Sequence, residues 1–82
     1  MSPTLLSFSQ VLNEMLANED SVYTRKGWNS QDQWIALQVP DVNSKMTKPY
    51  IYIRTVQGDL IPWLASQSDM LAFDWFLNTE AD

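Results

Sequence analysis

Apolar residues near the start of the chain recur at helical spacing. The positions i, i+3, i+4, i+7 and i+8 are held by Phe8, Val11, Leu12, Met15 and Leu16. This spacing predicts one apolar face of an α-helix that packs on a sheet. Ser7 stands just before the pattern, and Gln10 follows Ser7 by three residues. This spacing is typical of a capping box at a helix start. We expect residues 1–6 to form a loose lead-in before this helix, and the helix to end within residues 18–21.

Strict alternation between residues 50 and 55 predicts a strand. One face of this strand carries Ile51, Ile53 and Thr55. The other face carries Tyr50, Tyr52 and Arg54. Residues 57–59 supply a turn in which Gly58 can take a positive φ. Because Pro62 cannot donate to a sheet ladder, the next strand, over 60–63, should be short or lie at an edge.

Two further strands are expected before the central one. Residues 22–26 are β-prone and polar at alternate positions. Residues 34–39 alternate again and stop at Pro40. Their predicted core face consists of Ile35, Leu37 and Val39. The opposite face, with Trp34, Ala36 and Gln38, is expected to point outward, toward a partner or a ligand.

The C-terminal part of the chain predicts a second helix and a last strand. Ser66 and Asp69 have capping-box spacing, with Asp in place of the usual Glu or Gln. We expect a helix from Ser66 to residues 74–75, part of which meets another subunit, and a strand over 75–77. The predicted fold class is α+β, in a single domain of residues 1–82. An N-terminal helix packs on a small, mainly antiparallel sheet of four to five strands, with a second short helix near the C-terminus.

Composition narrows the function classes. The chain has 82 residues and contains neither cysteine nor histidine. Disulfides, thiolate metal sites and the usual general base are therefore unavailable. A small core without these devices favours self-association, and four Trp, three Tyr and three Phe suit an interface as well as a core. We expect no cofactor and no catalytic metal.

Charge and hydropathy limit the kinds of partner that we expect the chain to bind. The net charge is −5, which argues against binding a nucleic-acid polymer. A small anionic ligand needs only local donors, and all five basic residues lie between Arg25 and Arg54. No apolar run reaches the length of a membrane span and no signal peptide is visible, so we expect no membrane partner and a cytoplasmic location.

The strongest candidate ligand residues are aromatic and polar side chains near turns. Trp28 follows a glycine, so its ring can be offered for base stacking, while the Asn29 amide can read a base edge or a ribose. Trp28 can equally plug the open end of the core. Trp34 is a further candidate, because it lies on the strand face that is expected to point outward, toward a partner or a ligand.

A second group of candidates lies around the second helix and the central strand. Trp63 and Ser66 flank the helix start, and Asp69 either caps that helix or accepts hydrogen bonds from ribose hydroxyls. Arg54 offers a planar fork for phosphate beside Tyr50, or is simply solvated or interfacial. Asp74 either ends the helix or bonds across a subunit interface.

Catalysis has little support. Asp69 and Asp74 can be drawn as an acid–base pair, and with Asp59 as a magnesium site. All three occupy ordinary capping and turn positions, however, and no nucleophile has an adjacent histidine. We therefore expect a protein that is not an enzyme.

Two blocks of sequence resemble a small phage and prophage domain family, the second class of anti-Thoeris proteins. One block is Lys26-Gly27-Trp28-Asn29 followed by Trp34-Ile35. The other runs from Pro49 to Trp75 and contains Tyr-Ile-x-Ile-Arg-Thr, Ile-Pro-Trp, Ser-x-x-Asp and Asp-Trp. The resemblance covers residues 8 to 76 and departs mostly between residues 30 and 48.

The resemblance implies a sponge that sequesters a cyclic nucleotide immune signal without cleaving it. The implied ligands are cyclic ADP-ribose isomers such as glycocyclic ADP-ribose and, in some relatives, cyclic dinucleotides of CBASS defence. It also implies a homo-oligomer, a tetramer by resemblance, with a pocket between subunits walled by Trp28 and Trp63. The alternative is a protein-interaction or structural module of a phage or prophage.

Overall fold

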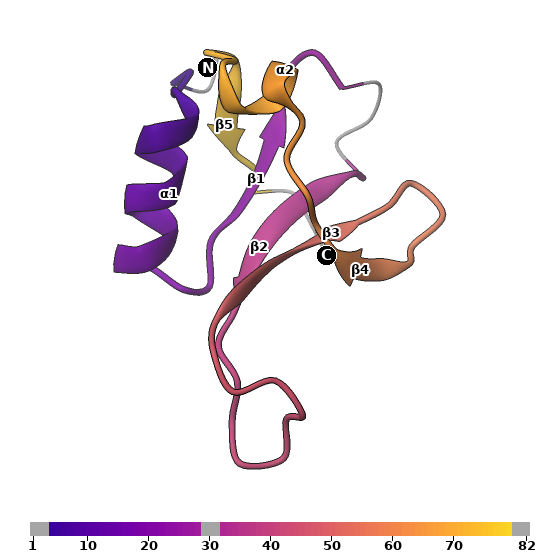
Figure 1. The fold of residues 1–82 in the computed structure, drawn as a ribbon. Helices are drawn as coiled ribbons and strands as arrows, with labels where there is room; N and C mark the ends of the chain where they lie inside the picture. The colour runs from indigo at the N-terminus through magenta and orange to yellow at the C-terminus, as the bar shows by residue number, and fades with distance from the viewer. Residues whose placement is uncertain (1–3, 29–31, 80–82) are drawn as a thin grey trace.

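A five-stranded antiparallel sheet is the centre of the computed structural model, which describes residues 4–28 and 32–79 (Figure 1). The elements in chain order are α1 (Phe8–Ala17), β1 (Val22–Arg25), β2 (Trp34–Gln38), β3 (Tyr50–Arg54), β4 (Leu60–Pro62), α2 (Gln67–Met70) and β5 (Trp75–Leu77). The strands are ordered β4-β3-β2-β1-β5, and every neighbouring pair is antiparallel. The predicted fold class is therefore confirmed.

Helix α1 begins with the predicted capping box. The Ser7 hydroxyl accepts from the Gln10 N–H at 3.3 Å, and the Gln10 side chain accepts from the Ser7 N–H at 2.8 Å. Val11 and Met15 are buried from this helix. Leu16 is 70% exposed, so its predicted place on the packed face is wrong. The helix meets the sheet through a narrower stripe than the spacing predicts.

The core lies between α1 and one face of the sheet. Its buried members are Val11, Met15, Tyr23, Ile35, Ile53 and Trp75. The strand members share a face because Tyr23 pairs with Ile35 and Ile35 with Ile53 across the ladder. The predicted core face of the central strand is thus confirmed at Ile53, whereas Ile51 and Leu37 pack against the cluster only partly buried.

The other face of the sheet corrects one prediction about exposure. Trp34 does lie opposite Ile35, but only 7% of its surface is accessible, and its ring packs edge-on against Tyr52 at 5.9 Å. Ala36 beside it is buried as well. The expectation of an exposed face is therefore wrong for Trp34 and Ala36, whereas Gln38 is exposed as predicted. Val39 lies beyond the end of β2 and is exposed, so its predicted place in the core is also wrong.

Several predicted boundaries differ from the structure. Helix α2 ends at Met70 rather than near residue 74, and Leu71 caps it. Four residues make barely one turn, and the chain then runs irregularly to β5. Strands β1, β3 and β4 each stop one residue before their predicted ends. The lead-in is fixed at Leu6, which exchanges two backbone hydrogen bonds with Trp75.

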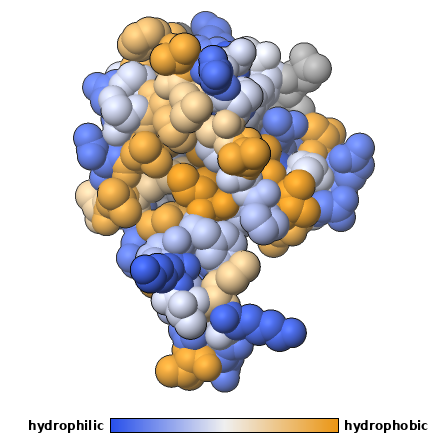
Figure 2. Space-filling model, in the orientation of Figure 1, coloured by the Kyte–Doolittle hydropathy of each residue, from blue (hydrophilic) through white to orange (hydrophobic). Residues whose placement is uncertain are grey.

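The connection between β2 and β3 projects away from the body of the molecule (Figure 1). Its residues between Val39 and Pro49 are exposed apart from the half-buried Pro40. Figure 2 shows apolar side chains distributed over the body of this face, while the projection is mostly hydrophilic apart from its tip. Within the described ranges, no helix is long and apolar enough to cross a membrane.

Candidate functional site

Three aromatic rings cluster around a fourth, Trp75, at the end of the core next to α2. Trp75 is completely buried at the start of β5. Trp28 packs edge-on against it at 5.2 Å between ring centroids, and Trp63 does so at 5.9 Å. Phe8 from α1 contacts both Trp63 and Trp75. Trp28 and Trp63 are only partly buried, so each keeps accessible surface beside the buried Trp75.

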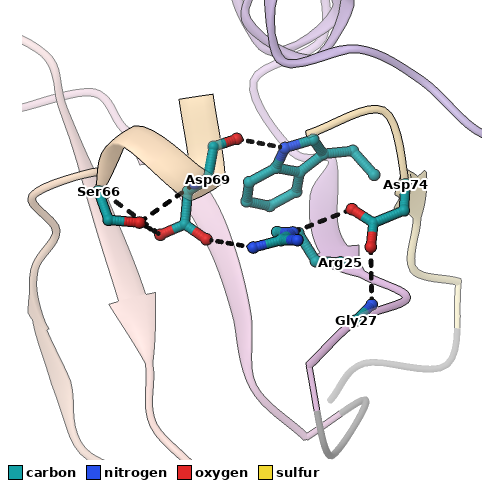
Figure 3. A network of polar contacts seen from close by, with 6 residues as sticks. Arg25, Gly27, Ser66, Asp69 and Asp74 are labelled. Carbon is teal, nitrogen blue, oxygen red and sulfur yellow. Dashed lines mark hydrogen bonds and ion pairs between the residues drawn. The ribbon is translucent and has the colours of Figure 1, made fainter. Parts of the chain in front are cut away.

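A polar network fixes the segments that carry these rings (Figure 3). The Arg25 guanidinium donates from Nη1 to Asp69 Oδ1 at 2.8 Å and from Nε to Asp74 Oδ1 at 2.9 Å. The second oxygen of Asp74 accepts the Gly27 N–H at 2.9 Å. The backbone carbonyl of Asp69 accepts Nε1–H of Trp75 at 3.0 Å. One arginine therefore joins β1, α2 and the residue that precedes β5.

The carboxylates of this network remain ionised over a wide pH range. Burial acts to raise the pKa of Asp69, but hydrogen bonds from Arg25 and Ser66 outweigh it, so the pKa lies below its ordinary value. The pKa of Asp74 is lowered in the same way, with Arg25 and the Gly27 N–H outweighing burial. The hydrogen bond with Asp74 raises the pKa of Arg25 in turn. All three groups are charged at neutral pH.

Gly27 is required by close approach. A Cβ placed on this residue would lie 2.9 Å from Asp74 Oδ2 and 3.3 Å from Nη2 of Arg25. The first distance is too short for a carbon and an oxygen, so any larger residue would displace the carboxylate. Gly27 thus lets the backbone approach this carboxylate closely, and Gly58 takes the positive φ expected in the turn.

The residues predicted around the second helix come together with Trp28. Ser66 caps α2: its hydroxyl accepts the Asp69 N–H at 3.1 Å and donates to Asp69 Oδ2 at 2.9 Å. The capping role of Asp69 is thereby confirmed. Trp63, three residues before Ser66, contacts the same buried ring as Trp28. Asn29 lies outside the described residues.

The remaining candidates lie on the other face of the sheet. Tyr50 and Tyr52 line a hollow of about 150 Å³ with Gln38 and strand β4. Arg54 donates from Nη1 to the backbone carbonyl of Asp32 at 2.6 Å. Trp34 is covered on this face. The structure therefore divides those predicted ligand residues that it describes into two groups on opposite faces rather than gathering them into one pocket.

Arg25 and Trp75 were not among the predicted site residues. A signal for Arg25 was present, because it stands two residues after Tyr23 and so shares the core face of β1. A charged residue on a core face needs a buried partner. Nothing in the local sequence identifies its partners, which are 44 and 49 residues away.

Comparison with known proteins matches the sequence of this chain to a named family. The Thoeris anti-defense 2-like domain matches residues 6–77 of the chain. A curated relative, Thoeris anti-defense 2 of Bacillus phage SP01, is 31% identical over 85 residues, which cover 88% of this chain and 93% of the relative. The chain belongs to the Thoeris anti-defense 2-like family.

Membership in the Thoeris anti-defense 2-like family supports a role against Thoeris defence. The matched span contains the whole aromatic cluster and the Arg25 network. Asp69 and Asp74, the carboxylates that can be drawn as an acid–base pair, both bind Arg25. In this member of the family, these two side chains have structural partners.

Proposed function

We propose that the chain binds a cyclic nucleotide signal and sequesters it unaltered, which blocks Thoeris defence by mass action. The proposed ligand is a cyclic ADP-ribose isomer such as glycocyclic ADP-ribose, with cyclic dinucleotides as the related second class. Sequestration requires a Kd below the signal concentration. A nanomolar Kd corresponds to about −12 kcal/mol.

The observation that carries the proposal is the arrangement of Trp28 and Trp63 on Trp75. Both rings are half-buried, and both are held edge-on by the same buried indole. A nucleobase that stacks on such a ring gains about 1–3 kcal/mol, and a fixed ring loses little rotamer freedom on binding. The Ser66 hydroxyl, three residues after Trp63 in the chain, is a further polar group for a ribose or a phosphate.

Exposed apolar side chains next to α2 support an oligomer with the pocket between subunits. Leu64 is 93% exposed and Phe73 is 77% exposed, and Met70 and Leu71 are exposed between them. We call these four residues the α2 patch. Large exposed apolar residues are typical of protein–protein contacts when they form one surface. A second copy at this patch would lie near Trp63 and deepen a surface that one subunit leaves shallow.

The fate of the ligand tests the proposal. The purified protein is incubated with glycocyclic ADP-ribose, separated from free nucleotide, and heated to release what it holds. A sponge depletes the free nucleotide and returns the same compound. Return of a different compound would make the protein an enzyme, and failure to deplete any member of a panel of cyclic nucleotides would reject the proposal.

The α2 patch also supports a second candidate function, a module that binds another protein. Such a module would leave every nucleotide in solution. Thermal shift separates the candidates, because a ligand at one hundred times its Kd stabilises the folded state by about 2.7 kcal/mol. A nucleotide panel that produces no shift, together with a monomeric chain, would favour the interaction module. For the sponge, we propose the cytoplasm of the infected host as its place of action.

A further inference from the structure

Arg25 is a charged residue on the side of the sheet that faces the core. It shares the α1 side of β1 with Tyr23, and 19% of its side chain is accessible. The side chains of Asp69 and Asp74 are 13% and 28% accessible. Two carboxylates from separate segments thus converge on one guanidinium at 2.8 Å and 2.9 Å. An isolated helix cap at Ser66 needs no such partner.

Each carboxylate uses its other oxygen to hold one flank of the aromatic cluster. On one flank, Asp74 Oδ2 accepts the N–H of Gly27, the residue before Trp28. The N–H of Trp28 donates to the carbonyl of Arg25 itself at 3.1 Å. On the other flank, Asp69 Oδ2 accepts from the Ser66 hydroxyl, at the end of the segment that begins with Trp63.

We propose that Arg25 is a positioning residue that sets the spacing between the Trp28 and Trp63 rings and thereby the affinity and size preference for the ligand. This inference rests on the proposed function. Arg25 acts through its two carboxylates and does not contact the nucleotide. Its charge is already matched by Asp69 and Asp74, so a ligand phosphate would compete poorly for it.

Loss of Arg25 removes the polar link between the two segments that carry the rings. Asp69 still caps α2 through Ser66, and Trp75 still backs both rings. The fold therefore survives while the 27–28 turn and the 63–66 segment move independently. Binding must then order these segments again, which weakens the affinity.

The test compares Arg25→Gln and Arg25→Lys with Ile53→Val, which removes one methylene from the core away from the network. Affinity for glycocyclic ADP-ribose and for a cyclic dinucleotide is measured by calorimetry at pH 7.5, at a temperature where far-UV circular dichroism shows every variant folded. We expect Arg25→Gln to weaken binding at least tenfold and to change the ratio of the two affinities. Arg25→Lys should recover part of the loss, and Ile53→Val should match wild type.

A measurement without ligand separates this inference from the proposed function. Near-UV circular dichroism reports the fixed geometry of the edge-on indoles, and acrylamide quenching reports their accessibility. Arg25→Gln should reduce the near-UV signal and increase quenching, whereas Ile53→Val should do neither. If wild type binds no nucleotide, the proposed function fails. The ligand-free spectra and quenching then decide whether Arg25 positions the two rings. If folded Arg25→Gln keeps the wild-type spectrum, or binds within twofold of wild type, the positioning role is wrong.

Discussion

The two faces of the sheet use the same kinds of residues to different ends. On the α1 side, Trp28 and Trp63 keep accessible surface around a buried Trp75. On the other side, Trp34 is itself the buried ring, and Tyr52 packs on its edge. An aromatic count cannot distinguish these situations. The difference lies in which ring is central and which rings are left partly open.

The two arginines repeat this contrast. Arg25 donates to the carboxylates of Asp69 and Asp74, which belong to different segments of the chain. Arg54 donates to the backbone carbonyls of Asp32 and Thr55. The first arrangement joins three parts of the fold around a ring cluster, whereas the second braces a loop against a strand. We therefore place the proposed ligand site on the α1 side.

The largest expected effect comes from removing the central ring of the cluster. Trp75→Ala should lower the free energy of unfolding by about 3–5 kcal/mol, because Trp75 is fully buried and donates to Asp69. That is a large fraction of the stability of a domain this small. Trp28→Ala, at the half-buried periphery, should lose about 1–2 kcal/mol. Urea unfolding measures both, and equal losses would contradict the central position of Trp75.

Acid should remove the contribution of the Arg25 network. The folded-state pKa values of Asp69 and Asp74 are lowered, so their stabilisation is fully present well above the unfolded value of about 3.9 and is lost as pH falls through the lowered values. Wild type should exceed Arg25→Gln by about 2 kcal/mol at pH 7 in urea unfolding, and by progressively less as the pH falls below about 3.9. Lys48→Gln, which removes a charge from the projecting loop, is the control. A difference independent of pH would contradict the assignment.

The two glycines separate close approach from backbone conformation. Gly27→Ala should cost about 1–2 kcal/mol and disturb the near-UV spectrum, because its Cβ would displace the Asp74 carboxylate. Gly58→Ala should cost about 1 kcal/mol, through its φ of +94°, and leave that spectrum unchanged. Identical spectra for wild type and both variants would show that Asp74 tolerates the added carbon.

The smallest effect on folding is expected at the α2 patch. Leu64→Glu and Phe73→Glu should change the free energy of unfolding by no more than about 0.5 kcal/mol, since both side chains are exposed in one chain. They should nevertheless dissociate the proposed oligomer in sedimentation velocity. Val42→Glu, on the projecting loop, should leave the oligomer intact. An unchanged sedimentation coefficient in both patch variants would remove the α2 patch from the interface.

Local pattern predicted the elements of this fold well because each is determined by neighbours in the chain. The capping boxes at Ser7 and Ser66 mark both helix starts, and alternation marks β3. The end of α2 was not predictable in this way, because a helix of one turn is too short to show a repeating apolar pattern that would mark where it stops. Nor was the burial of Trp34, which depends on what covers that face after folding.

The candidate site was predicted only in its local parts. Trp28 was found through the glycine before it, and Ser66 with Asp69 through their spacing. Their convergence on Trp75 depends on the β1–β5 pairing, in which Arg25 lies opposite Trp75. That register is a property of the whole sheet and leaves no mark on a short stretch of sequence.

Calorimetric titration of glycocyclic ADP-ribose into two variants tests most directly which face carries the ligand. One variant is Trp28→Ala, on the α1 side, and the other is Tyr50→Ala, beside the hollow on the opposite face. The account predicts that Trp28→Ala weakens binding about a hundredfold or more, which is about 2.7 kcal/mol, while Tyr50→Ala stays within about threefold of wild type. Wild-type affinity in Trp28→Ala, with binding lost in Tyr50→Ala, would contradict it.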